Sequence, residues 1–476
     1  MKMSLRSLYI ALPLIVAASP VWAAPDVRLL EAVKARDASA VRSLLSSRAD
    51  VNIPGTDELT PLHWAVQRDD LGLVDLLLAA GANAKATTRY HITPLYLACT
   101  NGNAAVIERL LKAGADVNEV SHEGQTALMT AASAGKADAV HLLLARGAKV
   151  NAVEPYRGQT ALMWAASDGN TAAVAELIEF GADVKVKSKG GLTPLLFAVR
   201  NGHIEATKLL LQHGANVNDT APDESNALSM AVVNAYFELG AVLLDFGANP
   251  NMPDPRGSAL HAIAWLRKPG TDGAAGVGNT PHGPPPPTGN VTALELARKL
   301  LAKGANPNTR ISWKEPRFGK EGGTAKNPPN IQLGRHFLSY IGATPFYVAA
   351  KNGDYQLMRV LVDGGADPKI STNAGITPLM AAAGLDYWEG ESPGPFAGVP
   401  EAERLEAVKM AFELGNDVNA AADFGDYKMT GETDYTRLYY PLNINELLDL
   451  GVGDPRWSGS TAMIGAVISG QPSIVQ

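Results

Sequence analysis

The chain of 476 residues contains little cysteine, few charged residues and few aromatic residues. Its single cysteine, Cys99, cannot form a disulfide within the chain, so packing has to stabilise the fold. Charged residues make up only 19% and the net charge is −7, which argues against nucleic-acid binding because that role needs a basic surface. Aromatic residues make up 6%, whereas 46 Gly and 31 Pro predict short helices separated by turns.

Long hydrophobic runs are also scarce, and the only one lies at the start of the chain. Residues 1–23 combine a basic beginning, the apolar run LYIALPLIVAA and a small residue, Ala23, at the end. This pattern predicts a cleaved signal peptide, because the run is too short to cross a bilayer comfortably; an uncleaved membrane anchor is the alternative. No later stretch reaches transmembrane length, so we expect an exported bacterial protein, periplasmic or secreted, with no membrane span after signal cleavage.

A repeated motif governs the sequence after residue 26. It opens as TPLHWAV at Thr60, TPLYLAC at Thr93 and TALMTAA at Thr126, in steps of 33 residues. Each complete unit closes with a Gly-Ala-polar turn such as GADVN at Gly114. Related openings follow at Thr160, Thr193, Asn226, Ser258, Thr344, Thr377 and Thr461.

One unit shows how such a segment should fold. Thr93 can cap a helix that begins at Pro94, and a second helix should end where Gly114 takes the left-handed conformation. Helices this short are marginal alone, so successive units should stack and bury both apolar faces in one continuous core. The positions expected in that core are Leu95, Ala98, Cys99, Val106, Leu110 and Leu111.

The TPLHxA opening, the LLxxGADVN close and the 33-residue step together resemble ankyrin-repeat proteins. The resemblance implies an all-α repeat solenoid of stacked helix-turn-helix units, with β-hairpin fingers on one edge and a binding surface on the concave side. Residues 24–56 lack a TPLH opening and are expected to form an N-terminal capping repeat, followed by full repeats over 57–266.

Insertions interrupt the repeats in the C-terminal half. We expect disorder in the first, which is rich in Pro and Gly, and order in the three later ones, which carry aromatic residues. The expected segments are a Pro/Gly-rich loop (267–291), the second helix of the interrupted repeat (292–309), a finger insertion (310–342), repeats over 343–420 with an insertion at 385–401, an aromatic finger insertion (421–458) and an incomplete final repeat (459–476). Because that last repeat stops within its second helix, we expect the natural chain to continue beyond Gln476.

No residue pattern indicates catalysis, a cofactor or a metal site. His63 and His261 occupy the fourth position of the TPLH opening, where the resemblance implies structural bonds between neighbouring fingers, and no two histidines have metal-ligand spacing. Cys99 lies on the apolar face of its helix, which predicts a buried and inert thiol. The glycine-rich stretches lack a phosphate-binding motif, so we expect a protein that is not an enzyme.

Binding is therefore the expected role. The resemblance implies that partners contact the finger tips and the exposed ends of the first helices, although each such residue could equally be an ordinary solvated turn residue. The finger candidates are Arg89, Tyr90, His122, Glu123, Tyr156, Arg157 and Lys189, and the helix-end candidates are Arg68, Asp168, Arg200, Asn201, Lys351 and Asn352. Trp64 and Trp164 follow the TPLH position and are expected in the core.

Three functions fit these patterns. The first is a non-catalytic scaffold that binds a protein partner, unidentified by the sequence, through its concave face and fingers. The second is implied by a resemblance, mainly of residues 376–476, to secreted ankyrin proteins that accompany c-type cytochromes: an accessory subunit of an exported redox or hydrolytic system. The third is carbohydrate or small-ligand binding by the aromatic insertions. The oligomeric state stays open at this point.

Overall fold

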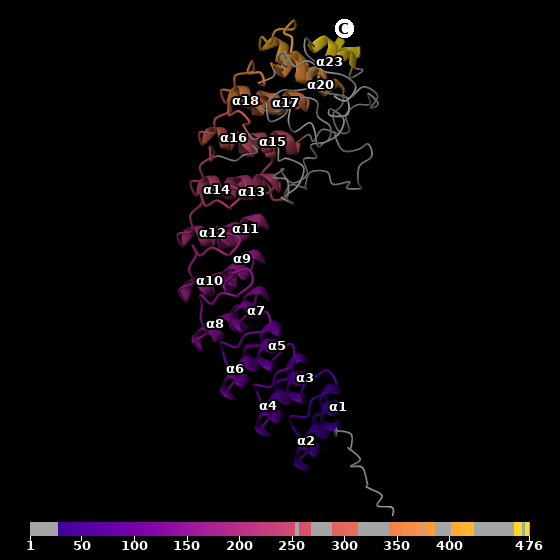
Figure 1. Ribbon diagram of the computed structural model, residues 1–476, viewed down its shortest axis with the longest axis vertical. Helices are drawn as coiled ribbons and strands as arrows, with labels where there is room; N and C mark the ends of the chain where they lie inside the picture. The colour runs from indigo at the N-terminus through magenta and orange to yellow at the C-terminus, as the bar shows by residue number, and fades with distance from the viewer. Residues whose placement is uncertain are drawn as a thin grey trace, which may run out of the picture. The chain divides into compact units, whose positions relative to one another are not determined.

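A computed structural model describes residues 27–252, 257–267, 288–312, 342–373, 375–385, 401–422, 461–468 and 472–475 (Figure 1). The chain divides into two compact units, Met1–Asp116 (unit 1) and Val117–Gln476 (unit 2), each of which is considered by itself. The expected signal peptide and most of the four expected insertions lie outside the described residues.

The described part of unit 1, residues 27–116, consists of three helix pairs. The first helix of each pair packs against the first helix of the next, so that α1 contacts α3 and α3 contacts α5, while α4 contacts α6. The pairs are α1 (Arg28–Lys34) with α2 (Ala38–Ser46), α3 (Pro61–Gln67) with α4 (Leu71–Ala79), and α5 (Pro94–Asn101) with α6 (Ala104–Lys112).

Unit 2 repeats the same arrangement in two layers, with the first helices in one row and the second helices in the other (Figure 1). The first row is α7 (Ala127–Ser133), α9 (Ala161–Ser167), α11 (Pro194–Arg200), α13 (Ala227–Val233), α15 (Ala259–Arg267), α17 (Pro345–Lys351), α19 (Pro378–Ala382) and α23 (Ala462–Ile468). The second row is α8 (Ala137–Ala145), α10 (Thr171–Glu179), α12 (Ile204–Gln212), α14 (Phe237–Asp245), α16 (Ala293–Ala302), α18 (Tyr355–Asp363), α20 (Glu401–Glu413) and α24 (Pro472–Val475). The expected all-α repeat solenoid is confirmed.

The expected caps begin and end these short helices. Thr93 Oγ1 accepts a hydrogen bond from the Tyr96 backbone N–H at 3.0 Å, and Pro94 occupies the first turn, where no donor is needed. Gly114 follows the second helix with a φ of 95°, the left-handed conformation that stops it. Equivalent side-chain caps start other first helices at Thr60, Thr126, Thr160, Thr193, Asn226, Thr344 and Thr377.

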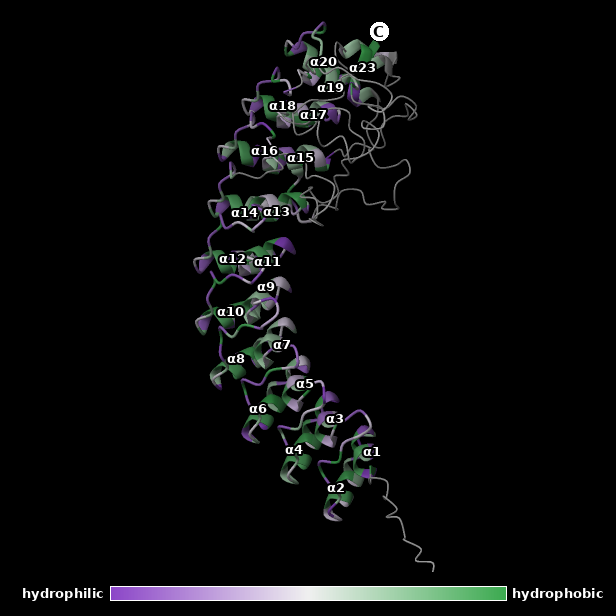
Figure 2. Cartoon of the chain, in the orientation of Figure 1, coloured by the Kyte–Doolittle hydropathy of each residue, from purple (hydrophilic) through white to green (hydrophobic). Residues whose placement is uncertain are grey.

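The core lies between the layers, as the apolar spacing predicts. Leu95, Ala98 and Cys99 are fully buried in unit 1, and so is Leu110 of the second helix. Leu111 is only half-buried, whereas Ile107, one turn earlier in the same helix, is buried. Hydrophobic residues line the helices while hydrophilic residues gather in the turns (Figure 2).

The fingers differ from the β-hairpins that the resemblance implies. In the described part of the chain they are tight turns closed by one or two backbone hydrogen bonds, with isolated bridges at Val120–Thr126 and Thr220–Asn226 and no strand. The finger at Ser121–Gln125, for example, closes through the Ser121 N–H to the Gln125 carbonyl at 2.8 Å. A loop this short has too few residues to form a series of hydrogen bonds between strands, so contacts with neighbouring repeats must stabilise it.

Asparagine side chains join successive repeats along the edge where the second helices end. Asn151 Oδ1 accepts from the Asp183 N–H at 2.9 Å, and its Nδ2 donates to the Gly181 carbonyl at 3.2 Å, one repeat further on. The same pair of bonds is made by Asn118, Asn251 and Asn308 in unit 2 and by Asn52 in unit 1. Lys185 occupies the equivalent position in its repeat and has no side-chain acceptor, so the series is interrupted there.

Candidate functional site

The finger of unit 1 presents an arginine and a tyrosine at its tip. The turn closes through the His91 N–H to the Thr88 carbonyl at 2.9 Å, which leaves Tyr90 with 61% of its surface exposed. Glu58 accepts from the Arg89 backbone N–H at 2.6 Å, and the Arg89 guanidinium lies 5.0 Å from the centre of the Tyr90 ring. The two expected side chains are therefore adjacent and accessible.

The second finger of unit 2, residues 153–159, has a similar tip. Tyr156 is 68% exposed and Arg157 is exposed beside it. Exposed tyrosine and arginine are the residue types that dominate binding energy in protein interfaces, because both bring large contact area and hydrogen-bonding groups. His122 and Glu123 are exposed on the finger before it, and Lys189 is exposed on the finger after it.

A buried carboxylate shapes the finger that carries Tyr156. Glu154 is 4% exposed, and its oxygens accept from the backbone N–H groups of Tyr156 at 2.7 Å, Arg157 at 2.8 Å and Gln159 at 2.9 Å. Burial opposes ionisation, but these hydrogen bonds and the nearby Lys189 ammonium outweigh it and lower the pKa of Glu154. The sequence indicated the exposed residues of this finger but not Glu154, the residue that fixes their backbone.

The helix-end candidates divide into exposed and enclosed residues. Arg68 is exposed in unit 1, and Asp168, Arg200 and Asn201 are exposed in unit 2. Asp168 accepts from the Ser133 hydroxyl at 2.6 Å, and Asn201 Nδ2 donates to the Ser167 carbonyl at 2.7 Å. These polar groups link neighbouring repeats while remaining accessible.

The expectation for Lys351 is wrong. This residue is 3% exposed, and α17, which contacts α15, α18, α19 and α20, is buried along its whole length. Asn352 is half-buried, and its Nδ2 donates to the Ala264 carbonyl at 3.1 Å. The Lys351 ammonium is therefore not accessible to a partner, and the Asn352 amide is already hydrogen-bonded to a neighbouring repeat.

The tryptophans also depart from expectation. Trp64 and Trp164 are half-buried rather than in the core, because their position lies at the margin of the first-helix layer. In unit 1, Lys34 Nζ lies 5.0 Å and Arg68 Cζ 5.8 Å from the centre of the Trp64 ring. Cations at these distances are attracted by the ring face, so Trp64 contributes to the surface that bears Arg68.

The two repeat histidines have the structural role that the resemblance implies. His63 Nδ1 accepts from the Thr60 N–H at 3.2 Å, so its Nε2 carries the proton and donates to the Ile92 carbonyl at 3.1 Å. His261 does the same with the Ser258 N–H at 3.0 Å and the Ala343 carbonyl at 3.1 Å. Burial lowers the pKa of both, in His261 to about 4.

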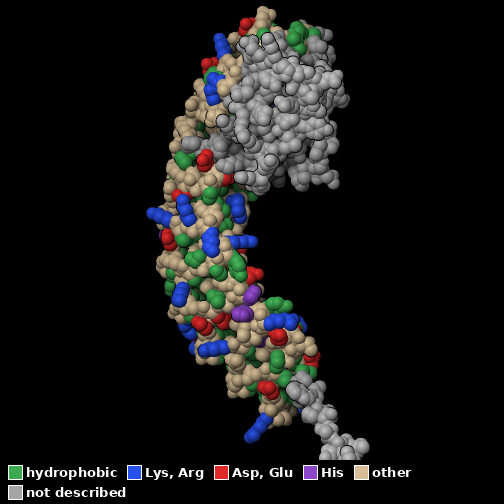
Figure 3. Space-filling view, viewed as in Figure 1, with side chains coloured by type: hydrophobic (Ala, Val, Ile, Leu, Met, Phe, Trp, Pro, Cys, Tyr) green, Lys and Arg blue, Asp and Glu red, His purple; other side chains and the backbone are tan. Residues whose placement is uncertain are grey.

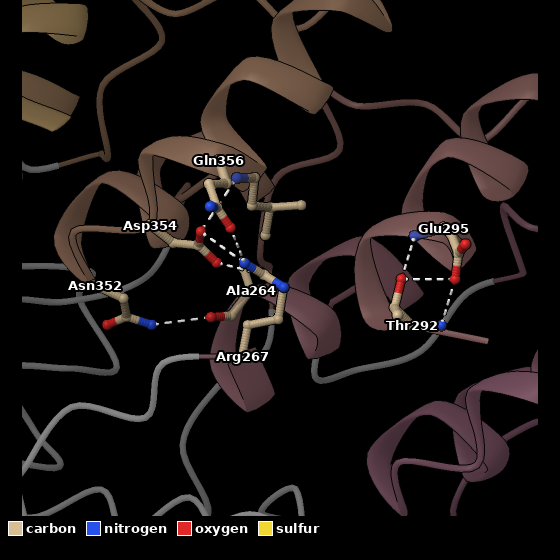
Figure 4. A network of polar contacts seen from close by, with 8 residues as sticks. Ala264, Arg267, Thr292, Glu295, Asn352, Asp354 and Gln356 are labelled. Carbon is tan, nitrogen blue, oxygen red and sulfur yellow. Dashed lines mark hydrogen bonds and ion pairs between the residues drawn. The ribbon is translucent and has the colours of Figure 1, made fainter. Parts of the chain in front are cut away.

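An ion pair that the sequence did not reveal joins the end of α15 to the start of α18 (Figure 4). Arg267, at the end of α15, donates from Nε to Asp354 Oδ2 at 2.6 Å and from Nη2 to Asp354 Oδ1 at 3.2 Å. The Asp354 side chain is fully buried and also caps α18 through the Leu357 N–H at 3.2 Å. The partners are 87 residues apart, so no local signal connects them.

Among the described residues, no group of three or more His, Cys, Asp or Glu side chains could hold a metal ion. Cys99 is buried, as expected. No helix in the described ranges is long and apolar enough to cross a bilayer.

Comparison with known protein families gives one result. A model of three ankyrin repeats matches residues 29–121, 114–188 and 162–254, and a model of a single ankyrin repeat matches residues 341–373. No curated protein matches the chain.

Proposed function

Because the chain belongs to the ankyrin-repeat family, we propose that it is a non-catalytic scaffold that binds a protein partner through its finger tips and first-helix ends. Ankyrin repeats are protein-interaction modules, and function has to be located in the side chains that the stack leaves accessible. The observation that carries the proposal is the pair of exposed Tyr–Arg finger tips, Arg89–Tyr90 and Tyr156–Arg157.

The packing of the repeats supports a binding role for the exposed finger tips. In the described repeats the apolar faces are buried between helices, and the buried polar side chains His63, His261 and Glu154 bond to backbone groups. Tyr156, by contrast, leaves most of its ring in solvent, which costs hydrophobic free energy that a partner can recover. Such residues are the expected contact points of an interface.

We further propose that the protein acts outside the cytoplasm, in the bacterial periplasm or after secretion. The support is the sequence of residues 1–23, with its basic start, short apolar run and terminal Ala23. Amino-terminal sequencing of the protein from the envelope or culture medium tests this proposal. A mature chain that begins at Ala24 is the expected result, and an intact Met1 in the cytoplasmic fraction would contradict it.

Site-specific photocrosslinking tests the binding role. Benzoylphenylalanine placed at Tyr90 or Tyr156 should crosslink to the same partner protein in living cells. Phe246, which is 38% exposed at the end of α14 and away from the fingers, is the control position and should give no such product. Equal crosslinking at all three positions, or none at either finger, would count against binding through the fingers.

A further inference from the structure

Two neighbouring fingers of unit 2, and the loop that leads from α10 into the second of them, carry a group of exposed cations. Burial alternates along residues 184–189, so that Val184 and Ser188 are buried while the lysines between and after them are exposed. Arg157, on the preceding finger, is exposed as well. We call the surface formed by Arg157, Lys185, Lys187 and Lys189 the basic finger pair.

Direct contacts hold the two fingers together. The Lys189 backbone N–H donates to the Arg157 carbonyl at 2.9 Å, and Lys189 Nζ donates to the Pro155 carbonyl. Gly158 makes the close approach possible, because a methyl group at its Cα would lie only 2.9 Å from the Lys189 nitrogen. The cations are therefore presented from a fixed base rather than from independent loops.

One of these cations, the Lys189 ammonium, acts on a carboxylate, that of buried Glu154, whose pKa it helps to lower. Within the described residues none of the four forms an ion pair. The Glu154 carboxylate is turned into its own finger and bonds to backbone N–H groups, and Asp183 Oδ1 accepts from the Lys185 N–H at 2.8 Å. In a chain of net charge −7, a group of exposed cations that form no ion pair among the described residues is a local feature that attracts anions.

The neighbouring fingers limit the size of this surface. Pro222 packs on Gly191, and the finger it begins carries exposed Asp223 and Glu224. On the other side Pro155 packs on Gly124, whose finger carries exposed Glu123. A long polyanion or a charged membrane would meet these acidic fingers, whereas a short acidic peptide segment would contact the cations alone.

We propose that the basic finger pair docks a short acidic segment, rich in Glu or Asp, of the protein partner. The proposal rests on the proposed function and adds the chemical class that these fingers recognise. Exposed Tyr156, next to Arg157, provides an aromatic contact at the edge of the charged surface. In Figure 3, Lys and Arg side chains gather on the viewed face beside the middle helices of unit 2.

The test measures binding of a fluorescein-labelled octaglutamate peptide to the full chain by fluorescence anisotropy. Binding should be saturable at low ionic strength and should weaken steeply as salt rises from about 50 to about 500 mM, since exposed charges are screened over a few ångströms at high salt. The double variant Lys185→Glu/Lys187→Glu should bind at least about tenfold more weakly, because two attractions become repulsions.

A control variant with the same change in net charge shows whether the loss of peptide binding is specific to the basic finger pair. Lys136→Glu/Arg298→Glu makes the same charge change at two exposed positions, the N-cap of α8 and a position within α16, and should alter the peptide affinity by less than about twofold. Thermal unfolding of both variants verifies that they fold. Equal weakening in both variants, or absence of peptide binding, would overturn the proposal.

Two further probes examine the class of partner. Single-stranded oligothymidylate and vesicles of phosphatidylglycerol and phosphatidylcholine should bind more weakly than the peptide. Tighter binding of either, lost in Lys185→Glu/Lys187→Glu, would reject the acidic peptide. If the Tyr156 crosslink forms equally well in this variant, the scaffold function stands and the acidic-segment proposal fails; if no crosslink forms in the unsubstituted chain, the scaffold function itself fails.

Discussion

Acidification should loosen the repeat that contains His261. In the folded chain this imidazole is fully buried, accepts from the Ser258 N–H through Nδ1 and donates from Nε2 to the Ala343 carbonyl. A second proton would have to sit on Nδ1, directly opposite the Ser258 donor. The Ala343 carbonyl also accepts from the Ile311 N–H at 2.9 Å, so loss of the imidazole bond would disturb the base of the finger insertion.

The size of the effect follows from linkage. Burial lowers the pKa of His261 to about 4 in the folded chain, against an ordinary value of about 6.5 in the unfolded chain. Between these values the unfolded chain binds a proton that the folded chain does not, so stability is complete above pH 6.5 and falls as the pH approaches 4. At pH 5 the loss from this one group is about 2 kcal/mol.

Two measurements test this reasoning. The His261 ring proton, assigned in NMR spectra by comparison with His261→Gln, should titrate near pH 4. Hydrogen exchange of the Ile311 amide, corrected for intrinsic rates, should lose about thirtyfold protection between pH 7 and pH 5, the equivalent of about 2 kcal/mol. His261→Gln should exchange faster at pH 7 but lack that pH dependence. A His261 titration near 6.5, or equal pH dependence in the variant, would refute the argument.

Three other substitutions probe contacts that the structure identifies. Glu154→Ala leaves three finger N–H groups unpaired and should lower the free energy of unfolding by about 1–3 kcal/mol in urea titrations, more than Glu154→Gln, which keeps an acceptor oxygen. Lys185→Asn should restore the interrupted asparagine series and raise that free energy by about 1 kcal/mol, whereas Lys187→Asn, two residues away, should leave it unchanged. Asp354→Ala leaves the Arg267 guanidinium without its buried carboxylate and should lower the free energy of unfolding by about 3–5 kcal/mol in chemical unfolding. The double variant Arg267→Met/Asp354→Leu should recover most of that loss. A double variant as unstable as the single one would contradict the assignment.

The local structure of each repeat could be read from the sequence. Thr93, Pro94 and Gly114 act within their own turns, so their roles depend on residue type and spacing alone. The same holds for the buried face of the first helix, because the positions three and four residues apart in a helix share one side. The structural role of His63 followed from its place in the repeat motif.

The accessible surface was predicted less completely. Tyr90 and Tyr156 are exposed as expected, because a turn tip of two or three residues cannot bury a large side chain. Lys351 occupies the same place in its repeat as Arg200, yet one is enclosed and the other is solvated. The repeat motif does not encode this difference, since α11 and α17 both pack against the first helices before and after them and against their own second helix.

The sequence by itself determined the repeat period, the caps, the turns and the identity of the buried apolar faces, because each of these depends on neighbours within about one helical turn. Only the tertiary structure decided which polar groups meet. Arg267 and Asp354 are 87 residues apart, and Lys189 reaches the carbonyls of Pro155 and Arg157 one repeat before it. Such contacts depend on how the repeats stack and on where insertions leave the stack. They therefore determine both the buried ion pair and the charged finger surface that we propose for the partner.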